Sequence, residues 1–163
     1  MREILQIGSP ILRKVASPVE NIHAPDIQDL VDLMLAMVFE RNGVGLAAPQ
    51  IGYSCRLIVV ASHPNARYPH APLMKPIAMI NPEILSHSED LIQGEEGCLS
   101  VRGKRGNVLR YGAIALKYYN RDGEEQKKEF DGFIARIVQH EIDHLNGILF
   151  VDHVQEALKT VTV

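Results

Sequence analysis

The chain lacks the segments that would direct a protein into or across a membrane. No apolar run in its 163 residues approaches the roughly 20 residues that a membrane-spanning helix needs. The N-terminal stretch MREILQIGSPILRKV contains no uninterrupted apolar core, and no small-residue cleavage site follows it, as one would in a secretory signal. We therefore expect a cytoplasmic protein.

Cysteine is scarce, with only Cys55 and Cys98 in the chain. A disulfide between them is one option, but disulfides are rare in proteins that are not exported. Free thiols, or one thiol that binds a metal, fit the sequence better.

The sequence also lacks any block of like charge. Its 17 basic and 20 acidic residues give a net charge of −3 and a pI near 6.1, and no basic stripe indicates a nucleic-acid or anionic-membrane partner. There is no internal repeat, low-complexity tract or linker. Hydrophobic residues make up 46% and charged residues 23%, so we expect one globular domain, residues 1–163.

Apolar residues recur at helical spacing after Pro25 and Asp26, up to a stop at Asn42-Gly43. This pattern predicts an amphipathic helix near the N-terminus. Short runs rich in branched and aromatic residues follow it, and they predict antiparallel strands at Arg56–Ala61, Ile77–Leu85, Val108–Tyr119 and Gln126–Phe130. We expect turns at Asn81-Pro82 and Asp122-Gly123, and a loop over Ser62–Pro76.

A second helix is expected from Asp131, a favourable N-cap, to about Leu145, with Asn146-Gly147 ending it. Its surface is largely apolar, which is typical of a helix buried among strands. Strands first and a buried helix late predict an α+β domain rather than a repeated βαβ unit.

The strongest chemical signal lies in this second helix, in the stretch QHEIDHLNG. His140 and His144 are four residues apart, on one face and about 6 Å apart along the axis, so both imidazoles can reach one metal ion. Glu141 is not a ligand at that spacing, but it can move a proton at the open coordination position. The alternative is a helix with two structural histidines, but burying these polar groups without a partner is costly.

A third ligand must come from elsewhere in the chain. Only 16 residues follow Gly147; they include Asp152, His153 and Glu156, which leaves a downstream ligand open. Cys98 is the better candidate, because a thiolate binds soft and borderline metals well. One thiolate and two imidazoles leave a coordination position for water, as catalytic sites do.

The glycine-rich stretch Gly43–Gly52 superficially contains a GxGxxA dinucleotide-binding pattern. That pattern requires a preceding strand and an acidic residue about 20 positions on, whereas here a helix precedes and residues 63–70 contain no Asp or Glu. We interpret the stretch as a tight connection, in which Gln50 is placed to donate to a developing oxyanion.

Together these segments resemble the peptide deformylase family. Gly43–Gly52 is similar to its first motif, Glu96–Ser100 to its second and Gln139–Gly147 to its third, in the same order and at similar separations. Ile7–Val19 and Ile77–Leu85 resemble the same family, so the likeness covers most of residues 1–153. The resemblance implies a central metal-binding helix surrounded by antiparallel sheets.

The resemblance also implies the activity, which is removal of the N-formyl group from formylmethionine at the start of nascent chains, with release of formate. It assigns the metal to Cys98, His140 and His144, the general acid/base role to Glu141, and oxyanion donation to Gln50 and the Leu99 N–H. Further residues match the substrate pocket or lie near it: Val44, Gly45, Glu96, Gly97, Arg105, Phe133 and Ile137. Glu96 is expected to pair with Arg110.

Iron(II) is the cofactor that the resemblance favours, and zinc, nickel or cobalt also suit these ligands. The sequence departs from the family at Arg102, where proline is common, and loop Ser62–Pro76 is longer than in the shortest relatives. The C-terminal residues lack a basic helix, so they do not support contact with the ribosome. Two rival hypotheses are an HExxH metallopeptidase and a non-catalytic metal-binding relative.

Overall fold

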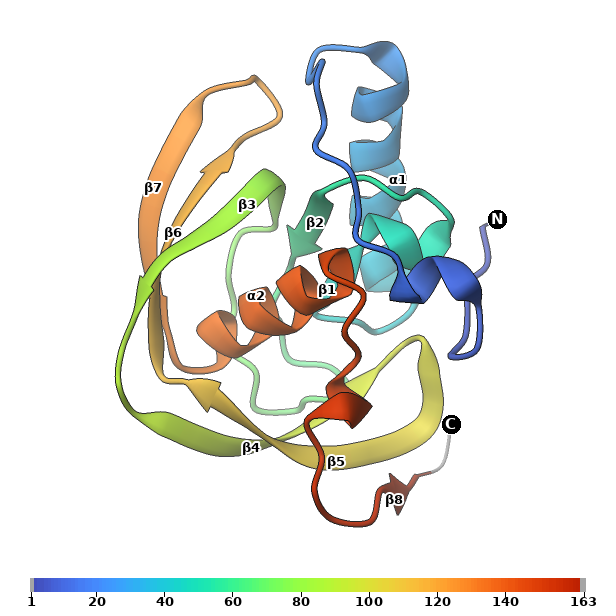
Figure 1. The fold of residues 1–163 in the computed structure, drawn as a ribbon, viewed down its shortest axis with the longest axis vertical. Coiled ribbons are helices and arrows are strands. Elements are labelled where there is room, and N and C mark those ends of the chain that lie inside the picture. The colour runs from blue at the N-terminus through green and yellow to red at the C-terminus, as the bar shows by residue number, and fades with distance from the viewer. Residues whose placement is uncertain (1, 162–163) are drawn as a thin grey trace.

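Two antiparallel sheets surround helix α2 (Gly132–Leu145) in the computed structural model, which describes residues 2–161. One sheet has the order β1-β2-β3-β6-β7 and the other β4-β5-β8. Figure 1 shows α2 across the centre, with the first sheet beside it and β4 and β5 passing below. The strands are β1 (Gly45–Ala47), β2 (Leu57–Val60), β3 (Ile77–His87), β4 (Leu91–Cys98), β5 (Val101–Tyr111), β6 (Ala113–Tyr119), β7 (Glu125–Asp131) and β8 (Lys159–Thr160). The α+β prediction is confirmed.

The predicted N-terminal helix is α1 (Pro25–Glu40). Pro25 occupies its first turn, where the missing N–H costs nothing, and Asn42 just beyond its end has a φ of 54°. The apolar face is buried against β1 and β2, with Leu30, Val31, Met34, Met37 and Val38 in the core. No described helix is long and apolar enough to cross a membrane.

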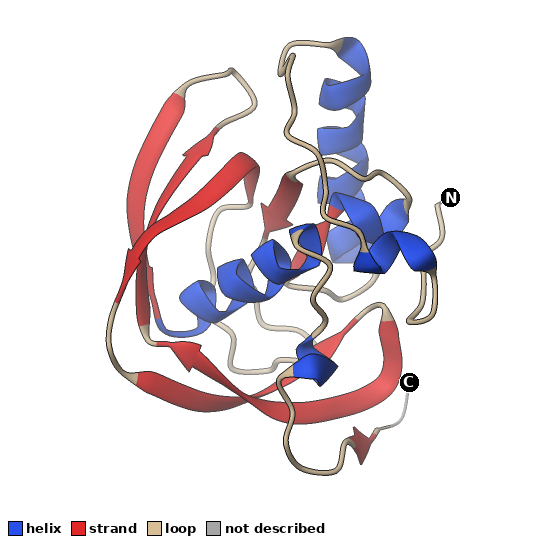
Figure 2. Cartoon of the chain, in the orientation of Figure 1, coloured by secondary structure: helices blue, strands red, loops and turns tan. Residues whose placement is uncertain are grey.

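Helix α2 is buried over most of its length, as its apolar sequence predicts. Ten of its 14 residues are buried, and strands cover it on several sides (Figure 2). Gly147, with a φ of 74°, follows its C-terminal end, in agreement with the prediction. Asp131 does occupy the N-cap position, but its side chain makes no capping hydrogen bond.

Three predicted strands correspond to β2, β3 and β7, and the loop over residues 62–76 contains no helix or strand. The prediction of a turn at Asn81-Pro82 is wrong, because both residues lie within β3. Asn81 has a φ of 52°, and its side-chain amide exchanges hydrogen bonds with the backbone of Val19. The register of β3 with β6 shifts here, and such a bulge tolerates a proline without an N–H.

The prediction of a single strand over Val108–Tyr119 is also wrong. This range contains the end of one strand and the whole of the next, and the two belong to different sheets. Strand β5 ends at Tyr111 and β6 begins at Ala113. Gly112 lies between them, where an added Cβ would be 2.6 Å from Asp90 Oδ2. The glycine therefore allows a close approach of the backbone that a larger residue would prevent. Strand β4 was not predicted, because glycine and glutamate dominate its sequence.

Candidate metal centre

Three side chains that can bind a metal meet where the end of β4 faces α2. Cys98, His140 and His144 each offer one ligand atom, and these atoms all lie within 4.8 Å of one another. The Cys98 Sγ is 3.3 Å from His144 Nε2. All three side chains are buried, with exposed fractions of 8% or less.

This group suits one divalent cation. Ligand bonds of 2.0–2.3 Å at tetrahedral angles separate neighbouring ligand atoms by roughly 3.5 Å, close to the 3.3 Å between Cys98 Sγ and His144 Nε2. Burial lowers the pKa of His144, which keeps that imidazole neutral with a lone pair available. The sulfur, the two imidazoles and their spacing together match the requirements of a borderline metal ion.

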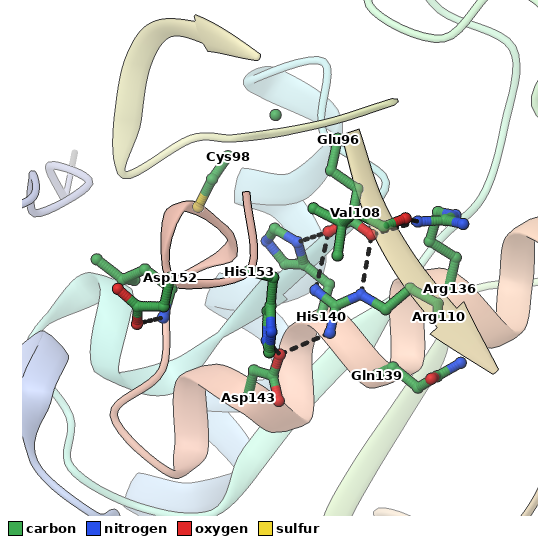
Figure 3. Close-up of polar contacts among 12 residues, drawn as sticks. Glu96, Cys98, Val108, Arg110, Arg136, Gln139, His140, Asp143, Asp152 and His153 are labelled. Atoms are coloured by element: carbon green, nitrogen blue, oxygen red, sulfur yellow. Dashed lines mark hydrogen bonds and ion pairs between the residues drawn. The ribbon is translucent and has the colours of Figure 1, made fainter. Parts of the chain in front are cut away.

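Glu96 holds His140 in place from the neighbouring strand. His140 Nδ1 lies 2.8 Å from Glu96 Oε1, so the other ring nitrogen, Nε2, faces the metal site. Arg110 and Arg136 also donate to the Glu96 carboxylate, over 2.9 Å and 2.7 Å (Figure 3). Burial would raise the pKa of Glu96, but the hydrogen bonds from Arg110 and His140 outweigh it and hold that pKa far below its usual range. Such outer partners fix the orientation of ligands.

The downstream residues that remained as alternative ligands are not part of this group. His153 Nε2 is 2.9 Å from Asp143 Oδ2, which also accepts a 2.6 Å hydrogen bond from Arg110. Asp152 pairs with Arg13 over 2.6 Å. Among the residues of the described chain, the only group that could hold a metal is the one with Cys98, His140 and His144.

Glu141 lies beside the candidate metal ligands in a buried position. Its side chain is buried, and its Oε1 has no hydrogen-bond partner among the described residues. Burial raises the pKa of Glu141 to about 7. A Cβ on Gly45 would lie 2.7 Å from Glu141 Oε2 and from Ile137 Cγ2, so the glycine makes room for the carboxylate.

Gln50 is oriented by hydrogen bonds at both ends of its amide. Its Oε1 accepts from the Ala47 N–H over 2.9 Å, and its Nε2 donates to Ser100 Oγ over 3.0 Å. The same Nε2 is 3.6 Å from Cys98 Sγ. The amide donor of Gln50 therefore faces the candidate metal site.

A pocket adjoins the metal ligands, and most of the predicted substrate residues line it. The lining includes Val44, Gly45, Gln50, Glu96, Gly97, Leu99, Phe133, Ile137 and Glu141. Arg105 lies outside this lining; its guanidinium is over the Tyr68 ring, 4.6 Å from the centroid, and pairs with Glu95 over 2.8 Å.

Sequence reasoning missed three residues of this pocket. Arg136, Arg67 and Tyr68 also line it. The Tyr68 hydroxyl accepts from the Gly97 N–H over 3.2 Å, and its ring packs on Phe133. An arginine within a largely apolar helix was a signal for Arg136, whereas nothing in the proline-rich loop marked Arg67 or Tyr68.

Comparisons with known proteins place this geometry in a family. The model of the polypeptide deformylase family matches residues 1–160. The chain is 54% identical over 159 residues to peptide deformylase 2 of Nostoc sp., covering 98% of this chain and 89% of that protein. The chain belongs to the polypeptide deformylase family.

Solved structures of deformylases share the fold. A class I type b peptide deformylase from Acinetobacter baumannii, with Met-Ala-Ser bound, superposes with a TM-score of 0.91 at 49% identity, over 94% of this chain and 98% of that one. A peptide deformylase from Thermotoga maritima gives 0.85 at 37% identity, over 96% and 99%. Deformylases are hydrolases of the formylmethionine amide that use one divalent metal, and the metal group described above is consistent with that membership.

Proposed function

We propose that residues 1–163 act as one catalytic domain that removes the N-formyl group from formylmethionine at the start of new polypeptides. The observation that carries the proposal is a buried carboxylate, Glu141, with one unpartnered oxygen beside the three-ligand group. A buried carboxylate without a partner lowers the stability of the folded protein. The same carboxylate is suited to proton transfer. The family membership supports the same activity.

The side chains of this chain have distinct roles in the hydrolysis. Cys98, His140 and His144 would hold the metal, which when bound supplies a Lewis acid for the carbonyl and lowers the pKa of water. Glu141 accepts a proton from the water that adds to the formyl carbon, and it delivers that proton to the amide nitrogen as the C–N bond breaks. The Gln50 amide and the Leu99 N–H donate hydrogen bonds to the oxygen that becomes negative. Formate and a free amine result.

The adjoining pocket takes the methionine side chain. Its walls include the apolar residues Val44, Phe133 and Ile137 together with Gly45 and Gly97. The deformylase of Acinetobacter baumannii holds Met-Ala-Ser, a peptide that begins with methionine. Glu96 forms part of the wall, but its oxygens already bond to arginines and His140, so we assign it to holding that wall and the ligand. The guanidinium of Arg105 lies over the ring of Tyr68, which lines the pocket. We therefore place Arg105 near the substrate but not in contact with the methionine side chain.

We propose iron(II) as the ion in the cell, with zinc, nickel and cobalt as ions that the same ligands accept. A thiolate beside a redox-active metal makes the site sensitive to oxidation. Metal analysis after anaerobic purification tests this choice, and an activity that is unaffected by air would contradict iron.

The partner and compartment remain proposals as well. We assign the chain to the cytoplasm, where new polypeptides begin, and the free state of both cysteines supports this. Contact with the ribosome has no support in the described residues 153–161, which form the short strand β8 and no basic helix.

The decisive variant is Glu141→Gln, which keeps the shape of the side chain and removes its basicity. We expect formate release from a formylmethionyl tripeptide to fall by at least about 10²-fold, while the metal content stays near that of the wild type. Glu129→Gln, on the exposed face of β7, is the matched control and retains activity. Near-normal turnover by the Glu141 variant would refute the role assigned to this carboxylate.

A further inference from the structure

The methionine pocket adjoins a second groove with a local excess of positive charge. The two cavities share Arg67, Cys98 and Leu99 in their lining. Five cationic residues line the second groove: Arg41, Arg67, Arg102, Lys104 and Arg105. Glu95 is the one carboxylate among its described lining residues. This excess contrasts with the net charge of −3 of the whole chain.

The shared walls of the two cavities offer a bound peptide a path into this groove. The reacting bond lies near Cys98 and Leu99, and the methionine side chain fills the first pocket, so the residues after methionine leave through the cavity that shares these walls. Another cavity, beside β6 and β7, has no lining residue in common with the methionine pocket. Because an extended chain advances 3.3–3.6 Å per residue, the second and third residues lie over the groove.

The one carboxylate among the described residues of the groove, Glu95, does not pair with Arg102 or Lys104. Glu95 already accepts from Arg105 and from Lys159, each at 2.8–2.9 Å. Lys104 donates to the hydroxyl of Thr160 over 2.9 Å, which leaves its charge uncompensated. The exposed side chain of Arg102 makes no hydrogen bond or ion pair with any residue that the structure describes.

Arg67 lines both cavities, so its positive charge lies where the groove meets the methionine pocket. Its guanidinium lies 5.4 Å from the centroid of the Tyr68 ring, and no described carboxylate pairs with it. A cation over an aromatic ring keeps its charge and its donors, so Arg67 can attract an anionic group on a peptide that leaves the pocket.

We propose that this groove makes the protein prefer formylmethionyl peptides with an acidic side chain at the second or third residue. The proposal rests on the proposed function and adds a substrate class to it. Arg102 and Lys104 are the groups that select, because complementary charge favours the matching partner and disfavours a like-charged one. Peptides with lysine at these positions are the disfavoured class.

The test compares formyl-Met-X-Y peptides that carry Glu, Gln or Lys at X or Y and end in a carboxamide, so that no terminal carboxylate competes. With the metal-loaded protein at low salt, we expect kcat/KM for the Glu peptide to exceed that for the Lys peptide by about 3- to 10-fold, mainly through KM. At about 1 M salt, where the screening length is near 3 Å, the preference falls toward unity. Equal values for all three peptides at low salt would overturn the proposal and leave the proposed function intact.

Variants at the groove locate the cause. Arg102→Gln with Lys104→Gln should reduce the preference, and Arg102→Glu should reverse part of it, whereas Lys128→Gln, on exposed β7, leaves it unchanged. A preference that persists in the Arg102 and Lys104 variants would also overturn the assignment. If no peptide releases formate, the proposed function itself fails, and this inference fails with it.

Discussion

At the scale of single residues, the two buried carboxylates of the site differ in whether their oxygens have partners. Glu96 bonds to two arginines and to His140, so the imidazole is oriented before a metal arrives. Glu141 is the opposite case, with an unpartnered oxygen in a buried position. The contrast separates a carboxylate that orients a ligand from one that is available to move a proton.

A prediction at this scale concerns Gln50, because the oxygen of its amide accepts a backbone hydrogen bond while the nitrogen faces the candidate metal site. Gln50→Glu keeps an oxygen for the Ala47 N–H but loses the donor that faces Cys98. We expect kcat/KM to fall by about 10²–10³-fold both in this variant and in Gln50→Ala. Both variants should lose stability, because the first buries a carboxylate and the second leaves the Ala47 N–H buried without an acceptor. Steady-state kinetics and urea denaturation measure the two effects. An unchanged kcat/KM in both variants would remove Gln50 from the oxyanion site.

At the scale of elements, the end of α2 determines where its histidines lie. Gly147 has a φ of 74°, and the chain beyond it passes close to the N-terminal segment. A Cβ on Gly147 would lie 2.5 Å from the Arg13 carbonyl oxygen. The glycine thus provides both the left-handed conformation that ends the helix and the space for the N-terminal segment.

Variants of the glycines at the two ends of α2 distinguish the effect of backbone conformation from the effect of space for the N-terminal segment. Gly132 also has a positive φ, of 56°, but a Cβ there meets nothing within 4 Å. Gly132→Ala should cost only the conformational strain, about 1 kcal/mol, whereas Gly147→Ala adds the clash with Arg13 and should cost about 2–4 kcal/mol. Urea denaturation gives both values. Equal losses in the two variants would show that the N-terminal segment moves aside at no cost.

At the scale of the whole molecule, the segments before α1 and after α2 are joined by an ion pair. Arg13, in the 3-10 helix Pro10–Arg13, meets Asp152, in the 3-10 helix Phe150–Asp152, at 2.6 Å. The hydrogen bond from Arg13 lowers the pKa of Asp152 from its usual value of 3.8. Both side chains are well exposed, at 46% and 39%, so solvent screening limits the contribution of this pair.

The lowered pKa predicts how acid affects this pair. A carboxyl whose pKa is lower in the folded state stabilises the protein above its unfolded pKa, and this stabilisation is lost as the pH falls through the folded pKa. Wild type should therefore exceed Asp152→Asn in unfolding free energy by less than about 1 kcal/mol at neutral pH. The difference should shrink below pH 3.8. Urea denaturation at several pH values measures it, and a gap that widens in acid would contradict the assignment.

Much of the site could be predicted from the sequence because its signals are local. The spacing of His140 and His144 fixes them on one helix face, and Gly147 marks where that helix ends. The apolar period of α1 and the Asp122-Gly123 turn between β6 and β7 are equally local, and the structure agrees with both. Cys98 was inferred from its chemistry as the missing ligand, and the fold brings it to the two histidines.

Tertiary structure alone decided the parts that depend on distant neighbours. Strand β4 has a sequence with little strand preference and forms because β5 pairs with it along its length. The break at Gly112 follows from the close approach of Asp90, and Arg67 and Tyr68 reach the pocket through contacts that their loop sequence does not indicate. Periodicity and capping act within a few residues, whereas pairing and pocket walls are set by segments far apart in the chain. The sequence by itself therefore determined the candidate metal group and the helix that carries two of its residues, and the packed fold decided what surrounds them.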